Sequence, residues 1–299
     1  AGDRYRFGVA SVTGVHTDAY QAGRTLARRA RDAARAADSP HGALLVLVDG
    51  LAGAEQTLLN GIYRVSGASV PVVGGAAGDD RRLRRTFVFH GDQVLDDAAV
   101  AVWIASERPV RVVCRHGWQP VGLPMLVTRA DGPVVHEIAG RPAREVFREN
   151  FRCQRPAHDL VWEMPGGRYS AGAFGLIEPD GSLLIRGAFI DPDGLIRTFA
   201  PLPTYSAVHL VSCRQEDLLA TADEIADLAL RETDDPAVLL AFSCVARLDI
   251  LRDRGGDEAA RLQAAAGTVP TFGFYTYGEY ARTRGVAGYH NATIAAVAL

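Results

Sequence analysis

Two stretches of this chain repeat one layout: Val70-Pro-Val-Val-Gly-Gly-Ala-Ala-Gly-Asp79 and Val269-Pro-Thr-Phe-Gly-Phe-Tyr-Thr-Tyr-Gly-Glu279. Each begins with Val-Pro and ends with glycine followed by an acidic residue. Each follows an apolar run, Leu44–Val48 in the first half and Leu239–Cys244 in the second. Apolar segments long enough for buried strands come after both. The sequence therefore predicts two pseudo-symmetric modules.

The same order of elements is predicted around both stretches. Amphipathic helices are expected over residues 17–37, 54–65, 217–231 and 258–266, and each precedes an apolar strand. The middle, from about residue 86 to 199, contains turn signals between short apolar runs and is expected to be β-rich. We therefore predict an α/β fold with mixed sheets flanked by helices, divided into modules 1–150 and 151–299.

Composition excludes several classes of function. The net charge of −3 offers no general attraction for nucleic acid or an anionic membrane. All 32 cationic side chains are arginine, so no lysine chemistry is available. The four cysteines form no Cys-x-x-Cys pair, and no apolar run approaches the roughly 18 residues that span a bilayer. We expect a cytoplasmic protein with reduced thiols that binds neither nucleic acid nor membrane.

Several segments together resemble the FIST family, a bacterial and eukaryotic sensory module with an N-terminal and a C-terminal part, and the resemblance implies a bacterial sensory protein. The first part of the resemblance rests on residues 73–79, 86–89, 99–102, 117–122, 127–129 and 140–143. The second rests on Phe242-Ser-Cys-Val-Ala-Arg247, Gly273-Phe-Tyr-Thr-Tyr-Gly-Glu279 and Tyr289-His-Asn-Ala-Thr293. Their order and spacing extend over most of the chain after about residue 15.

The resemblance implies that the protein senses a small molecule and signals to an output. Such outputs include histidine kinases, diguanylate cyclases and chemotaxis receptors. Because the FIST-like segments take up this chain, the resemblance implies an output partner in trans. Some members resemble haem-based nitric oxide sensors, so haem is the one cofactor that the resemblance suggests.

The second copy contains reactive groups that the first copy lacks, and these are the candidate ligand-binding residues. Cys244 ends a buried strand, where ligands of such sheets gather, and Arg247 follows it closely. If helix follows, its free N–H groups and Arg247 would suit a carboxylate. The alternative is a structural cysteine and an arginine that satisfies loop carbonyls.

An alternation of Tyr275, Tyr277 and Glu279 places all three on one face if the segment is extended. Two phenols and a carboxylate could hold an ammonium group by charge and cation–π contact. The alternative is an aromatic face packed on the other module. His290 and Asn291 precede the last strand and could also contact a ligand, or make a strand-edge turn.

Three hypotheses follow from these residues. The first is a sensory protein, not an enzyme, that binds an amino-acid-like metabolite between its modules, and it predicts that an Arg247→Ala variant folds but binds no ligand. The second is a haem sensor or haem enzyme with His290 or His116 as axial ligand. The third is a thiol enzyme with Cys244 as nucleophile and His290 as base. The first is favoured because no nucleophile, base and orienting group are apparent as a set in the sequence.

Overall fold

The computed structural model describes residues 4–150, 162–164, 168–170, 172–231, 233–282 and 288–299. Its first sheet has the strand order β1-β6-β2-β3-β20-β21. The strands are β1 (Tyr5–Thr13), β2 (His41–Val48), β3 (Val72–Ala76), β6 (Ala98–Ser106), β20 (Glu279–Arg282) and β21 (Tyr289–His290). β2 and β3 are parallel, whereas β6 runs antiparallel to both β1 and β2. The sheet is therefore mixed, as the sequence predicts.

The second sheet repeats the first four strands of this arrangement. Its order is β19-β18-β22-β7. The strands are β7 (Val112–Arg115), β18 (Leu239–Cys244), β19 (Thr271–Thr276) and β22 (Ile294–Ala298). β18 and β19 are parallel, and β22 runs antiparallel to both β18 and β7. The predicted pseudo-symmetry of the two modules is confirmed, with β3 and β19 formed by the two repeated stretches.

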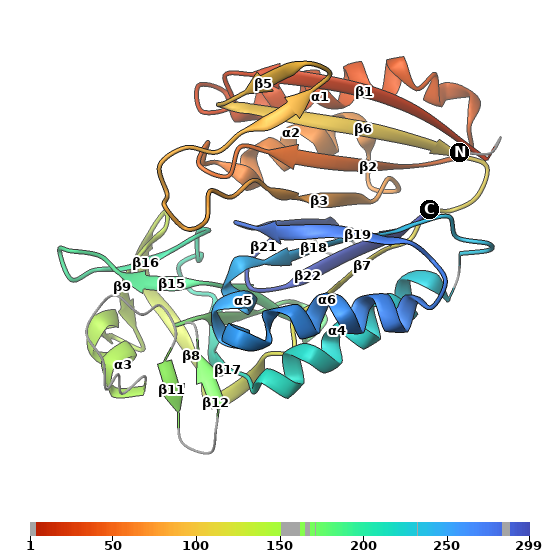
Figure 1. The fold of residues 1–299 in the computed structure, drawn as a ribbon. Coiled ribbons are helices and arrows are strands. Elements are labelled where there is room, and N and C mark those ends of the chain that lie inside the picture. Colours follow the sequence, from red (N-terminus) through yellow and green to blue (C-terminus); the bar gives the residue numbers. More distant parts are fainter. Residues whose placement is uncertain (1–3, 151–161, 165–167, 171, 232, 283–287) are drawn as a thin grey trace.

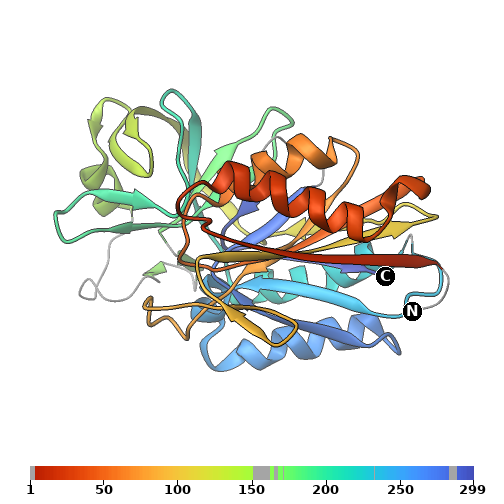
Figure 2. The ribbon, with the colours of Figure 1, turned by 90° about the horizontal axis from the view of Figure 1, so that it is seen from above.

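The two sheets pack face to face, and helices cover their outer faces (Figure 1). The first sheet is covered by α1 (Ala19–Ala33), which runs alongside β1 (Figure 2), and by α2 (Glu55–Ser66). The second is covered by α4 (Gln215–Leu230) and α6 (Gly255–Ala266). The remaining α-helices of the described residues are α3 (Ala143–Asn150) and the short α5 (Val245–Leu251), and two 3-10 helices span Ala36–Asp38 and Arg252–Arg254. The result is a helix–sheet–sheet–helix sandwich.

The apolar strands explain this layering. In β2, Leu44 and Val46 pack against the helices, whereas Ala43 and Leu45 belong to the core between the sheets. Since successive side chains of a strand point to opposite faces, a strand between two cores must be apolar at every position. None of the helices in the described part of the chain combines the length and apolarity that a membrane-spanning helix needs.

The β-rich middle forms a third, antiparallel sheet between β7 and α4 in the sequence. Its order is β14-β13-β17-β8-β9-β16-β15, and β10 pairs with β9. The strands are β8 (Gln119–Asp131), β9 (Val134–Ile138), β10 (Arg141–Pro142), β13 (Phe174–Ile177), β14 (Leu183–Arg186), β15 (Ala188–Ile190), β16 (Ile196–Thr198) and β17 (Ala207–Ser212). Two further pairs are β4 (Val88–His90) with β5 (Gln93–Leu95), and β11 (Trp162–Met164) with β12 (Arg168–Ser170).

One hairpin crosses from the second sheet to the first. After β19 the chain turns at residues 277–278, and β20 then pairs antiparallel with β3, with Glu279 opposite Gly75. In the first copy the equivalent hairpin, β4–β5, forms its own small sheet. Gly75 permits the close approach, because a Cβ there would lie 2.3 Å from Cγ2 of Thr276. The crossing brings the three sheets together at the carboxyl ends of β18 and β19.

Candidate functional site

The residues singled out in the sequence lie around this junction. Cys244 ends β18, Arg247 lies in the following helix α5, and Glu279 begins β20. His290 ends β21, which contacts β14 of the third sheet. The carboxyl ends of parallel strands are the usual place for ligands in α/β sheets. The junction, rather than a single module, is therefore the candidate site.

Arg247 is held by protein groups on all sides. Its side chain is fully buried, and its Nε and Nη2 donate to Oε1 of Glu258 at 2.9 and 2.5 Å. Nη2 also donates to the carbonyl of Leu218 at 2.9 Å, and Nη1 donates to that of His116 at 3.1 Å. The second oxygen of Glu258 accepts from Ser243 at 2.7 Å. These bonds give Arg247 a structural role, which the sequence analysis named as the alternative to ligand binding.

Glu279 is a buried carboxyl group with no exposed surface. Its Oε1 lies 2.6 Å from Oγ1 of Thr276, and Oε2 accepts from Oγ1 and N of Thr293 at 2.7 and 3.2 Å. Thr276 Oγ1 also lies 3.2 Å from the carbonyl of Ser243. A hydroxyl has one proton, so Thr276 can donate to Ser243 and still bond Glu279 only if Glu279 is protonated.

Burial raises the pKa of Glu279 to about 7, and the hydrogen bonds from Thr276 and Thr293 oppose this shift. Burial and the neighbouring Glu279 charge raise the pKa of Cys244. Cys244 is therefore a protonated thiol, whereas nucleophilic cysteines are exposed and thiolate-rich. The ring of His290 bonds the carbonyl of Ala281 at 2.8 Å. These contacts do not support the thiol-enzyme hypothesis.

The two tyrosines and Glu279 diverge, because the extended segment ends at Thr276. Tyr275 donates from its hydroxyl to the carbonyl of Gly255 at 3.1 Å, and burial raises its pKa. Tyr277 donates to the carboxylate of Asp79 in the first module. This bond joins the two repeated stretches, because Asp79 ends the first and Tyr277 lies two residues before the end of the second. The described contacts do not place the three side chains on one shared pocket wall.

Arg186 is the residue of this junction that the sequence analysis missed. It ends β14, is 4% exposed, and donates through Nη1 to the carbonyl of Tyr289 at 2.8 Å. Its Nε has no hydrogen-bond partner, and the described residues provide no carboxylate in ion-pair contact with it. Burial lowers its pKa to about 10. A sequence signal exists, since Arg186 follows three apolar residues of one strand.

His290 and Asn291 lie next to the carbonyl that Arg186 binds. Burial lowers the pKa of His290 to about 4, against its bond to Ala281, and the charges of Arg186 and His116 lower it further. Oδ1 of Asn291 is buried and has no hydrogen-bond partner. Two orphaned polar atoms, Arg186 Nε and Asn291 Oδ1, therefore lie at one junction, where most buried polar atoms in proteins are paired.

His116 completes the junction directly after β7 of the second sheet. Its Nδ1 accepts from the backbone N–H of Trp118 at 2.9 Å, so the ring proton is on Nε2. Burial, and then the charges of Arg247 and Arg115, lower its pKa to about 4. Both histidines are thus neutral at pH 7. The described residues hold no group of three or more histidine, cysteine or acidic side chains placed to bind a metal ion.

Family models match nearly the whole chain. The FIST N domain matches residues 1–141, and the FIST C domain matches residues 143–282. The chain belongs to the FIST family. FIST domains are associated with sensory signalling in general, so the family agrees with a sensory role and names no ligand.

Relatives of this FIST protein occur in bacteria and archaea. It is 27% identical over 236 residues to the uncharacterized protein Mb0898c of Mycobacterium bovis, covering 74% of this chain and 58% of the relative. The uncharacterized protein Rv0628c of Mycobacterium tuberculosis is 28% identical over 230 residues, with 74% and 59% covered. The uncharacterized protein MJ1623 of Methanocaldococcus jannaschii is 29% identical over 104 residues, with 35% and 20% covered. The chain thus spans less than two thirds of their length.

Proposed function

We infer that this FIST protein is a cytoplasmic sensor that binds a small carboxylate metabolite, such as an amino acid, where its modules meet. The observation that supports the proposal is the buried guanidinium of Arg186, whose Nε has no partner. An unpaired buried charge is unfavourable unless an oppositely charged group binds it. Since Nη1 is used by the carbonyl of Tyr289, Nε is the donor that a carboxylate oxygen would bind.

The proposed site keeps residues that were proposed from the sequence. Arg186 takes over the carboxylate-binding role that the sequence analysis assigned to Arg247. Neutral His290 donates from Nε2 to the carbonyl of Ala281, so its Nδ1 is an acceptor and suits an ammonium group rather than a carboxylate. Oδ1 of Asn291 can accept from an ammonium group, which would favour an amino acid among small carboxylates. Cys244, Arg247, Tyr275, Tyr277 and Glu279 then form the layer that holds these groups in position.

Binding at this junction is suited to signalling. Arg186 belongs to the third sheet, His290 to the first, and Asn291 leads into β22 of the second. A ligand that bridges them favours one relative arrangement of the sheets, and a partner that contacts two sheets would sense the difference. The partner that we propose is a histidine kinase or a diguanylate cyclase acting in trans.

The test is a calorimetric titration with sodium acetate, the smallest carboxylate probe, and with acetamide, which has the same shape and no charge. We expect saturable acetate binding and at least tenfold weaker acetamide binding. An Arg186→Gln variant should lose acetate binding, whereas an Arg197→Gln control should keep it, because Arg197 already pairs with Asp191 at 2.6 Å. Equal acetate binding by the Arg186 variant and the wild type would contradict the proposal.

Haem is the alternative ligand, and the junction does not fit it. A haem pocket is a flat apolar slot of several hundred Å³. The described surroundings of His116 and His290 are instead hydrogen-bonded polar and backbone groups, including the carbonyl of Ala281 and the N–H of Trp118. We therefore expect no Soret band after incubation with haem and desalting. A persistent Soret band that is lost in a His290→Ala variant would restore the haem hypothesis.

A further inference from the structure

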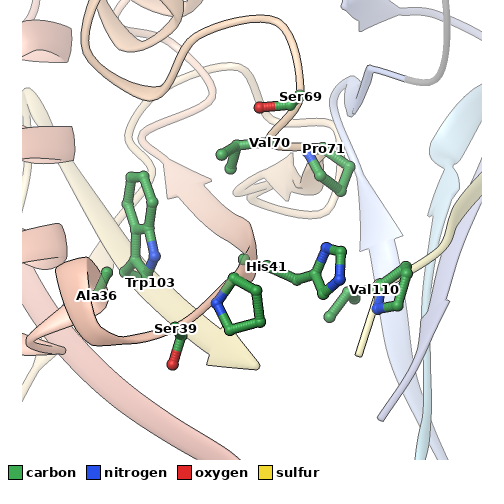
Figure 3. A pocket seen from close by; sticks show the side chains of 11 residues that line it. Ala36, Ser39, His41, Ser69, Val70, Pro71, Trp103 and Val110 are labelled. Carbon is green, nitrogen blue, oxygen red and sulfur yellow. The ribbon is translucent and has the colours of Figure 1, made fainter. Parts of the chain in front are cut away.

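A small cavity at the starts of β2 and β3 does not identify a ligand. It has a volume of about 170 Å³, and Figure 3 shows Trp103 on one side, Val70 and Pro71 above and His41 in the middle. Its walls mix polar and apolar groups, and no arginine or acidic residue of the described chain lines it. The free edge of the second sheet is chemically better defined.

The second sheet ends at β19 with this free edge. β19 is the first strand in the order β19-β18-β22-β7, and within the described ranges no strand pairs with its other side. The equivalent strand of the first copy, β3, is paired on both sides, because β20 continues the first sheet antiparallel to it. The internal repeat thus shows that an antiparallel strand completes an edge of this kind. Arg186 lies in the third sheet, so the inference does not depend on the proposed function.

Two phenylalanines of β19 are exposed at this edge. Phe272 is 65% exposed and Phe274 is 39% exposed. Their neighbours on β18, Leu240 and Phe242, pack in the core between the two sheets, and paired residues of adjacent strands point to the same face. Phe272 and Phe274 therefore lie on the inner face of the second sheet, where a second layer normally covers apolar side chains.

The inner face of the first sheet is also uncovered, at β1. Phe7 and Val9 are 43% and 45% exposed, and they pair with Ile104 and Val102 of β6, which pack in the same core. In the second copy the strand equivalent to β1 is β7, and β20 contacts it. By the same symmetry, a strand added beside β19 would lie over Phe7 and Val9. One added strand would thus cover both exposed surfaces.

The edge lacks the charges that protect most exposed strands. Residues 268–278 contain no charged side chain, and Pro270 lies just outside β19. By contrast β1, an edge strand of the first sheet, carries Arg6. Proteins usually prevent free edges from pairing by means of charged side chains, prolines or bulges. An uncharged edge can approach an identical edge without charge repulsion.

The sequence of β19 is suited to pairing with itself. Thr271-Phe-Gly-Phe-Tyr275 is nearly symmetric about Gly273. In an antiparallel pair of two copies centred on Gly273, Phe272 of each copy lies opposite Phe274 of the other. Such cross-strand aromatic pairs stabilise a sheet, and a two-fold interface requires this kind of self-complementarity.

We propose that β19 pairs antiparallel with β19 of a second copy of this chain. The four-stranded second sheets of the two copies then form one continuous sheet, and no free edge remains at β19. Phe272 and Phe274 of both copies contact one another across the interface. Their removal from water favours the dimer, in addition to the new backbone hydrogen bonds.

Sedimentation equilibrium tests the interface. The wild type should be a dimer in equilibrium with monomer, and Phe272→Glu should raise the dissociation constant at least about tenfold, because symmetry places the charge in the interface twice. Phe89→Glu is the matched control and should dimerise like the wild type, because Phe89 is 66% exposed on the separate strand β4. Circular dichroism should show that both variants fold, since each replaces an exposed side chain.

Two results would overturn the proposal. A wild type that stays monomeric at the highest concentration measured would leave this edge to a strand of another protein. Equal dissociation constants for Phe272→Glu and Phe89→Glu would show that the chains associate through another surface or that the effect is not specific to β19.

Disulfide formation tests the register. When Phe272→Cys and Phe274→Cys chains are mixed and oxidised, the introduced thiols should cross-link them, because directly opposite residues have Cβ atoms about 4.5–5.5 Å apart. Phe272→Cys alone should not cross-link, since position 272 lies diagonally from its own copy, at about 7–8 Å. The wild type, oxidised in the same way, controls for the native cysteines. No cross-link in the mixture, or an equal one in Phe272→Cys alone, would contradict the antiparallel pairing.

Discussion

The junction contains two buried guanidinium groups that differ in their partners. Arg247 has Glu258 and two backbone carbonyls, whereas Arg186 has two carbonyls and an unused Nε. The sequence directed attention to Arg247 because it follows a buried strand and Cys244. It could not show that Glu258, eleven residues later, takes that charge, nor that β14 brings Arg186 to the same place. Pairing between distant segments is decided by tertiary packing.

Removing Arg247 should destabilise the fold rather than affect binding alone. Arg247→Met leaves Glu258 buried without its partner, and breaking a buried pair in this way costs about 3–5 kcal/mol. Urea unfolding followed by circular dichroism measures this loss. The control is Arg261→Met, which removes a partly exposed pair with Asp223 and should cost less than about 1 kcal/mol. Equal stability of the two variants would contradict the structural role of Arg247.

Glu279 should give the protein a distinctive pH dependence. Its pKa is raised from 4.5 to about 7 in the fold, so the folded state binds more protons than the unfolded state between these values. The free energy of unfolding must therefore fall as the pH rises from 4.5 through 7, and a Glu279→Gln variant lacks this loss. The other titrating groups cancel in the difference between the two proteins.

We expect the stability of Glu279→Gln relative to wild type to increase by on the order of 3 kcal/mol from pH 4.5 to above 7. Urea unfolding at pH 4.5, 5.5 and 7.5 would measure it. The amide introduced by this substitution can retain the contacts, because it can accept from Thr293 and donate to Thr276, which then donates to Ser243. A difference that does not vary with pH would show that folding does not raise the pKa of Glu279.

At the scale of elements, the sequence predicts most helices and strands but not the crossing hairpin. The apolar runs of β2, β6, β18 and β22 are long and regular. The helix predicted from residue 17 begins after its N-cap Asp18, which accepts from the N–H of Gln21 at 3.0 Å. β20 has only four residues and no regular pattern. Its position is set by Gly75, whose missing side chain lets the other sheet approach.

A Gly75→Ala substitution tests this contact between the sheets. The new methyl would lie 2.3 Å from Cγ2 of Thr276, and such overpacking costs about 1–3 kcal/mol. A Thr276→Ser substitution removes Cγ2 and keeps the hydroxyl that Glu279 binds. We therefore expect the double variant to recover most of the stability lost in Gly75→Ala, in a double-mutant cycle of unfolding free energies. Additive losses would indicate that the two positions do not limit the approach.

At the scale of the whole molecule, two copies of one layout have acquired different roles. The first copy has its own β4–β5 hairpin, whereas the second contributes its hairpin to the first sheet. The repeated stretches predict the two modules and the sheet ends where the candidate site lies. They do not predict that the third sheet brings the charge of Arg186 to the candidate site, because this inserted sheet has no counterpart in the first copy. The site is thus a property of the assembled chain.

The central claim is that Arg186 remains unpaired in order to bind a carboxylate. The most direct measurement is the Tm of the wild type and of an Arg186→Met variant as sodium acetate is added, with sodium chloride keeping the ionic strength constant. Without acetate, the variant should be at least as stable as the wild type, because it removes a buried charge for which the described residues provide no ion-pair contact. With acetate, only the wild type should gain stability, by an amount that follows the acetate concentration. A variant that is less stable throughout and responds equally to acetate would contradict the claim.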